Sequence, residues 1–204
     1  MQDAENSLRK AFELDPKLAS SAFRLSEIEM KQGKLDEAMN LLSQVSQLEP
    51  QMASVEIRMG QVSEMKGDWK GAENFYTNAL NIDKEDPIAK NNLAWVYAEH
   101  GGNLDVGLKL AQEAKNASPA SLDVSDTLAW VLVQKKRFAE AVPLLQDCVS
   151  KDSNNSLFNY HLGVAYYGLG ERSNAKQYLQ TAIKLHLDSQ DDFNHATQIL
   201  LELK

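Results

Sequence analysis

The sequence predicts an all-α fold made of repeated helix hairpins, and three observations support this prediction. Small residues recur along the chain every 34 or 35 positions. Apolar residues between them recur with the spacing of a helix face, not with the alternation of a strand. Glycine (10) and proline (5) are few in 204 residues, and no run rich in Val, Ile and Thr predicts a sheet. A fixed period of this length is typical of stacked helix pairs.

Two columns of small residues carry the repeat. The later column in each unit consists of Ala4, Ala38, Ala72, Gly107, Ala141 and Ala175. Each member of the earlier column follows a bulky apolar residue, and that column consists of Ser26, Gly60, Ala94, Ala129 and Gly163. Antiparallel helices pack about 8–10 Å apart, and small residues permit the closest approach. We therefore predict that the two columns face each other inside each hairpin.

Each unit is predicted to contain two helices separated by a tight turn. The first helix carries apolar residues one turn apart, as in Val124, Leu128 and Val131. Glycine follows the first helix in four units, where we expect a left-handed backbone that glycine adopts cheaply. These glycines are Gly33, Gly67, Gly101 and Gly170. Lys136 stands at this place in the fourth unit, at an expected cost of up to ~1 kcal/mol relative to glycine.

Composition limits the classes of partner. The net charge of −8 argues against a nucleic-acid partner, because affinity for nucleic acid depends largely on cations that neutralise phosphates. The sequence contains no stretch of about 18 apolar residues, so we expect no direct insertion into a membrane. The single cysteine, Cys148, is expected to be buried inside a second helix and does not decide between the cytoplasm and the periplasm.

The clearest unit reads LFNYHLGVAYYGLGERSNAKQYLQTAIKL over residues 157–185. Its Leu-Gly pair, the later tyrosine and the later alanine resemble the tetratricopeptide repeat (TPR), and the resemblance covers almost the whole chain. It implies a right-handed α-solenoid of stacked antiparallel helix hairpins, closed by a C-terminal capping helix. The expected segments are the second helix of a truncated repeat at 1–18, five repeats at 19–52, 53–86, 87–121, 122–155 and 156–189, and the capping helix at 190–204.

The resemblance also implies that the first helices line a concave groove and that the chain is a non-enzymatic scaffold or adaptor. The expected ligand is an extended peptide or a partner helix, with no cofactor. The candidate groove residues are Phe23, Met30, Ile57, Asn91, Trp95, Asp126, Trp130, Tyr160 and Tyr167. Two alternatives stay open for Trp95 and Trp130: they lie exposed in the groove as binding hot spots, or they fill space between neighbouring repeats.

The sequence also allows functions other than peptide binding in the groove. The groove positions lack the cations that chaperone-adaptor TPR proteins use to hold a carboxylate tail, and only Asn92 matches that pattern. A structural alternative is self-assembly through the half-repeat at 1–18. Because this half-repeat lacks its first helix, we expect the chain to be cut from a longer protein.

A metal site near the last turn would use His186, His195, Asp188, Asp191 and Asp192, but their spacing matches no zinc or calcium pattern. The similarity to large bacterial TPR proteins suggests an envelope or export assembly.

Overall fold

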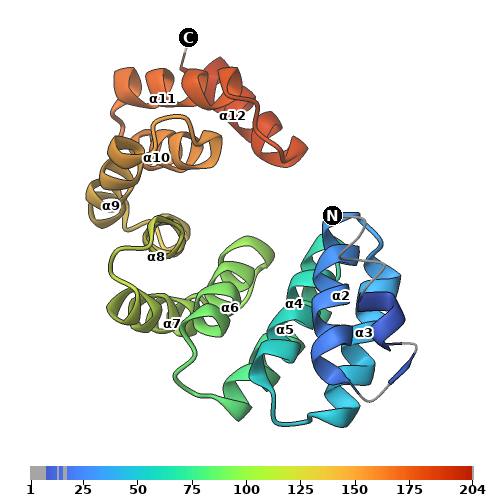
Figure 1. Ribbon diagram of the computed structural model, residues 1–204. Helices are drawn as coiled ribbons and strands as arrows, with labels where there is room; N and C mark the ends of the chain where they lie inside the picture. The colour runs from blue at the N-terminus through green and yellow to red at the C-terminus, as the bar shows by residue number, and fades with distance from the viewer. Residues whose placement is uncertain (1–7, 13, 16–17, 204) are drawn as a thin grey trace. The chain divides into compact units, whose positions relative to one another are not determined.

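The computed structural model describes residues 8–12, 14–15 and 18–203, and every regular element in this part of the chain is an α-helix (Figure 1). The chain divides into two compact units, Met1–Val96 and Tyr97–Lys204, and the division falls inside one helix. The predicted all-α fold is confirmed. The expected half-repeat at 1–18 lies partly outside the described residues, of which 8–12 and 14 are helical.

The first unit is built from hairpins whose helices pack in chain order (Figure 1). Its helices are α2 (Ala19–Lys31), α3 (Leu35–Leu48), α4 (Ala53–Met65), α5 (Trp69–Ile82) and the first part of α6 (Pro87–His100). A buried core joins α2, α3 and α4, and consists of Ala22, Leu25, Ala38, Leu41, Leu42, Val45, Val55, Met59 and Val62. Phe12 packs against this core from the N-terminal segment.

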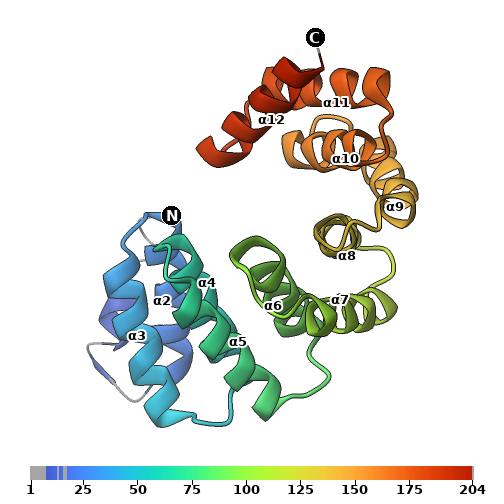
Figure 2. The ribbon, with the colours of Figure 1, turned by 180° about the vertical axis from the view of Figure 1, so that it is seen from behind.

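The second unit begins at the end of α6 and continues the same pattern. Its helices are α7 (Leu104–Ala117), α8 (Leu122–Gln134), α9 (Phe138–Lys151), α10 (Ser156–Gly168), α11 (Arg172–Lys184) and α12 (Gln190–Glu202). Helix α10 packs against α8, α9 and α11, and α12 covers α10 and α11 (Figure 2). Ala196, Ile199 and Leu203 are the buried apolar residues of the α12 segment. The repeat boundaries stay a prediction, because helix ends alone do not define where a repeat begins.

In two hairpins a glycine of the earlier column lies in close contact with the paired helix, but the residue that it meets is bulky and is not a member of the later small column. A Cβ atom added to Gly60 would lie 2.5 Å from Cε1 of Tyr76 on the paired helix. A Cβ atom added to Gly163 would lie 2.7 Å from Cγ of Leu179. Atoms this close would overlap, so a large side chain on the second helix fills the space that glycine leaves on the first. Tyr76 and Leu179 are both fully buried.

The predicted left-handed turns are also confirmed. The four glycines after the first helices have φ between 74° and 83°. Lys136 has φ 58° and so adopts the conformation that glycine adopts in the other units. His186, just after α11, has φ 61° and was not expected to be left-handed. These two residues carry a Cβ atom where the backbone favours glycine.

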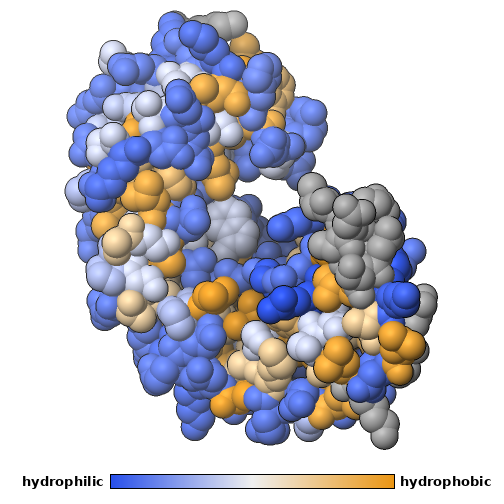
Figure 3. Space-filling view, viewed as in Figure 1, coloured by the Kyte–Doolittle hydropathy of each residue, from blue (hydrophilic) through white to orange (hydrophobic). Residues whose placement is uncertain are grey.

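The surface is mainly polar. In the face shown in Figure 3, hydrophobic side chains form scattered groups between hydrophilic ones. None of the helices in the described part of the chain is both long and apolar enough to cross a bilayer.

Candidate interaction site

A buried polar and aromatic cluster lies between α8 and α10 in the second unit. Nδ1 of His161 lies 2.8 and 2.9 Å from the two carboxylate oxygens of Asp126. The His161 side chain is 0% exposed and the Asp126 residue 3%. The Trp130 ring stacks on the imidazole, with 4.0 Å between centroids and 19° between planes. These contacts join the first helices of two neighbouring hairpins.

The cluster extends from these residues to two further helices. The indole N–H of Trp130 donates a hydrogen bond to Oε1 of Glu99, at the end of α6. The Tyr160 ring lies 5.7 Å from the Trp130 ring, and its hydroxyl lies 2.7 Å from Nδ1 of His195 on α12. Residues 97–100, α8, α10 and α12 therefore each contribute a side chain to one cluster in the second unit.

Two ionisable groups of this cluster have raised pKa values. Burial raises the pKa of the Glu99 carboxyl, and the charges of Asp192 and Asp126 act in the same direction, against His161 and the Trp130 hydrogen bond. Burial also raises the pKa of Tyr160, and the carboxylates of Asp192 and Glu99 raise it further. Burial is therefore the main cause of both shifts, and neighbouring carboxylates add to it because a negative charge disfavours deprotonation.

The nine predicted groove residues divide by burial. The buried members are Ile57, Asp126, Trp130 and Tyr160. The half-buried members are Phe23, Met30, Asn91, Trp95 and Tyr167. In the second unit the structure brings Asp126, Trp130 and Tyr160 together. Trp130 is 3% exposed, which agrees with the alternative that this tryptophan fills space between neighbouring repeats. Trp95 is half-buried, so part of its side chain is exposed to solvent. Contact of these residues with a partner stays a prediction.

Sequence reasoning missed the part that Glu99 plays. Glu99 lies one helical turn after Trp95, so the same helical projection would have placed it on the same side of α6. His195 and Asp192 were considered as metal ligands, but the structure brings His195 to Tyr160. Among the described residues, no three His, Cys, Asp or Glu side chains are grouped to hold a metal ion.

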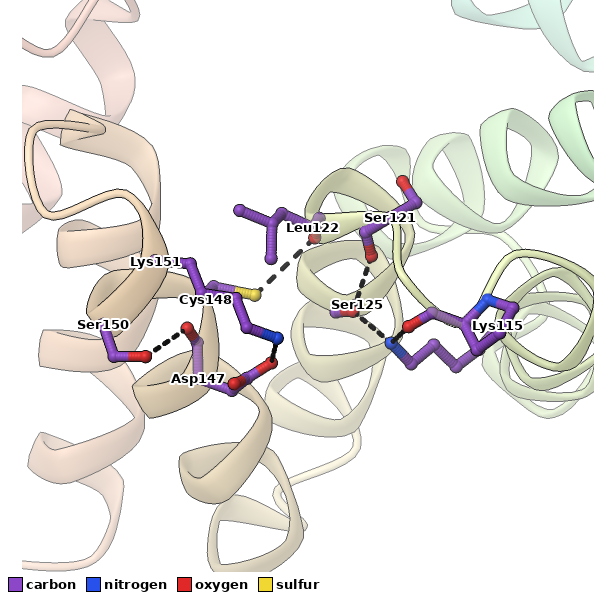
Figure 4. Close-up of polar contacts among 9 residues, drawn as sticks. Lys115, Ser121, Leu122, Ser125, Asp147, Cys148, Ser150 and Lys151 are labelled. Carbon is purple, nitrogen blue, oxygen red and sulfur yellow. Dashed lines mark hydrogen bonds and ion pairs between the residues drawn. The ribbon is translucent and has the colours of Figure 1, made fainter.

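A separate groove lies on the second helices. It has a volume of about 750 Å³ between α7 and α9, with Leu128 and Leu132 of α8 in its lining. Ion pairs occupy its edges, such as the two hydrogen bonds of 2.6 Å from Arg137 to Glu140. Lys115 also lines the groove and donates to the Pro119 carbonyl and to Oγ of Ser125 (Figure 4). The charged groups at these edges are therefore largely satisfied within the chain.

Cys148 is buried, as predicted. Its thiol donates to the Leu122 carbonyl at 3.6 Å, across the contact between α9 and α8 (Figure 4). Burial raises the pKa of this thiol to about 12, and the nearby charges of Asp126 and Asp147 add to the shift. Because a thiolate is the reactive form, this cysteine packs as a small apolar residue and has no nucleophilic role at neutral pH.

Comparison with known proteins agrees with the resemblance to the tetratricopeptide repeat. The family model "Tetratricopeptide repeat" matches residues 1–58 and 132–194. The TPR repeat-containing protein YpiA of Bacillus subtilis (strain 168) is 27% identical over 137 residues, which are 64% of this chain and 32% of that protein. The chain thus spans about a third of the length of that relative.

Solved structures share the fold at low sequence identity. YrrB, described as a TPR protein with an unusual peptide-binding site, has a TM-score of 0.68 and 19% identity, over 94% of this chain and 97% of YrrB. The APC/C hetero-tetramer Cut9–Hcn1 has a TM-score of 0.84 and 13% identity, over 99% of this chain and 39% of that one. Since the family model covers more than half of the residues, the chain belongs to the tetratricopeptide repeat family.

Proposed function

We propose that this chain is a non-enzymatic interaction scaffold that binds an extended peptide or a partner helix on the side formed by its first helices. The family consists largely of protein-interaction modules, and YrrB of the same fold has a peptide-binding site. The described residues also hold no metal-ligand group, and their one thiol is buried. An adaptor role fits these properties better than catalysis.

The observation that carries the proposal is the cluster around Trp130 and Tyr160. Aromatic rings and carboxylates from the first helices α8 and α10 and from the end of α6 meet there, together with His195 of the C-terminal helix α12. Its inner members Trp130 and Tyr160 are buried, whereas Glu99 keeps part of its surface exposed. A packed aromatic support next to a half-exposed charged group is a common arrangement in binding hot spots.

Selection of peptides tests this proposal. A phage library of random dodecapeptides is selected on the immobilised chain, and enriched peptides are synthesised and measured by fluorescence anisotropy. We expect Trp95→Ala to weaken binding about tenfold or more, as for a central aromatic anchor. Trp69→Ala is the matched control, because Trp69 is 36% exposed at the start of the second helix α5.

Two outcomes would contradict the proposal. One is a library that yields no peptide with saturable binding. The other is an equal loss in Trp95→Ala and Trp69→Ala, which would place the ligand elsewhere. Thermal melting of both variants shows whether each keeps its fold.

A second candidate function is self-assembly through the N-terminal half-repeat. Leu14 is 78% exposed and Leu18 is 40% exposed, so apolar surface is available in that segment. Light scattering across a hundredfold range of concentration tests this function, and a constant monomer mass would exclude it.

A role in a bacterial envelope or export assembly stays a prediction from the resemblance, and crosslinking in the native cell would test it.

A further inference from the structure

We propose that the partner segment is basic and that one of its Lys or Arg side chains docks against Glu99 and Asp192 in the second unit. This inference rests on the proposed function, because it names the chemistry of the ligand that the first helices bind. It is carried by the distribution of charge between the two sets of helices and by the geometry of the cluster.

The cations in the helices of the second unit are segregated. Helices α8, α10 and α12 have 13 residues each and contain no Lys or Arg, although they contain five carboxylates. These are Asp123, Asp126, Asp191, Asp192 and Glu202. The second helices α7, α9 and α11 contain carboxylates as well, at Asp105, Glu113, Glu140 and Asp147, but these helices also contain all the helix cations, which are Lys109, Lys115, Lys151, Arg172, Lys176 and Lys184. Solvation alone would require no such separation, so the first helices form a surface suited to a positive ligand.

The aromatic cluster fixes Glu99 and the turn of α12 that carries Asp192. Glu99 accepts a hydrogen bond from Trp130, whose ring lies 5.7 Å from that of Tyr160. The Tyr160 hydroxyl in turn lies 2.7 Å from Nδ1 of His195, which follows Asp192 by about one turn on α12. A continuous set of contacts therefore links Glu99 at the end of α6 to the turn of α12 that carries Asp192. Fixed acceptors bind a cation with less loss of side-chain entropy than mobile ones.

Their burial leaves these carboxylates reachable but partly desolvated. Glu99 and Asp192 are both half-buried. Within the described residues neither carboxylate forms an ion pair with a lysine or arginine, whereas Asp126 deeper in the cluster is bonded to His161. A cation from the ligand would supply the missing positive charge, and the pair would be stronger at a half-buried site than at an exposed one.

Other ligand chemistries fit this surface less well. A carboxylate tail or a phosphate would be repelled by the carboxylates on α8 and α12. The net charge of −8 on the whole chain would likewise attract a basic segment and slow the approach of an acidic one.

The test uses the dodecapeptides selected from the random phage library. We expect Lys or Arg to be enriched at one position at least, and replacement of that residue by Met to weaken binding about tenfold. Glu99→Gln and Asp192→Asn should each weaken binding of the unmodified peptide by a similar factor. The matched controls are Glu171→Gln and Asp152→Asn, which remove an exposed carboxylate beside α11 and α9 and should change binding less than about twofold.

A double-mutant cycle separates contact from general charge effects. In Glu99→Gln or Asp192→Asn, the Lys-to-Met change in the peptide should lose most of its effect. The proposal of a basic ligand would be wrong if the selected peptides contain no cationic residues, or if they bind all four variants as well as the wild type. Either result would leave the scaffold function intact. Failure to select any peptide would remove the proposed function, and this inference with it.

Discussion

His161 and Asp126 form a bidentate contact in which one ring nitrogen lies within 2.9 Å of both carboxylate oxygens. The two residues are 35 positions apart and belong to successive first helices, α8 and α10. Both are buried, and Trp130 covers the imidazole. A polar contact of this kind fixes the register between two hairpins, because its geometry tolerates little sliding.

Removal of one partner should therefore be costly. We expect Asp126→Ala to destabilise the second unit by about 2–4 kcal/mol, because it leaves the buried imidazole without its carboxylate. Urea unfolding followed by circular dichroism measures the loss. Asp123→Ala, on the exposed start of the same helix, is the control and should cost less than about 1 kcal/mol. Equal losses in the two variants would show that the buried contact adds nothing to stability.

The contact between Gly163 and Leu179 gives a second prediction. Gly163→Leu should destabilise the chain by ~1–3 kcal/mol, because even a Cβ atom at this position would overlap the Leu179 side chain. Leu179→Ala opens space on the opposite helix, so the double variant should lose less stability than the sum of the two single variants. Thermal unfolding of the three variants measures this coupling, and strict additivity would mean that the two residues do not compete for space.

The sequence predicted the contacts within a hairpin better than those between hairpins. The close approach of Gly60 and Gly163 to the second helix follows from side-chain size and a fixed period, which are local properties. The later small column does not supply the residues that meet these glycines. The pairing of His161 with Asp126 depends on how one hairpin is rotated against the next, and many side chains determine that rotation together. The same reason explains why the sequence could not decide whether Trp130 is packed or exposed.

Lys136 provides a test of backbone strain. Its φ of 58° lies in the left-handed region, where a Cβ atom is disfavoured and glycine is not. Lys136→Gly should stabilise the second unit by up to ~1 kcal/mol, although the greater freedom of glycine in the unfolded chain reduces the gain. Gln134→Gly, in the last turn of α8, is the control and should destabilise by ~0.5–1 kcal/mol. Loss of stability in both variants would mean that the lysine side chain contributes more than the strain removes.

Glu64 predicts a pH dependence in the first unit. Burial raises the pKa of its carboxyl from 4.5 to about 7, against the smaller opposing effect of the nearby Tyr76 hydroxyl. Between these values the folded chain binds more protons at this site than the unfolded chain, so this residue lowers stability as the pH rises from about 4.5 to 7. Glu64→Gln should thus match the wild type at pH 5 and exceed it by about 1–3 kcal/mol at pH 8. Urea midpoints at pH 5, 6, 7 and 8 measure the difference, with the exposed Glu37→Gln as a control. A constant difference between Glu64→Gln and the wild type at all four pH values would show that Glu64 titrates normally in the folded chain.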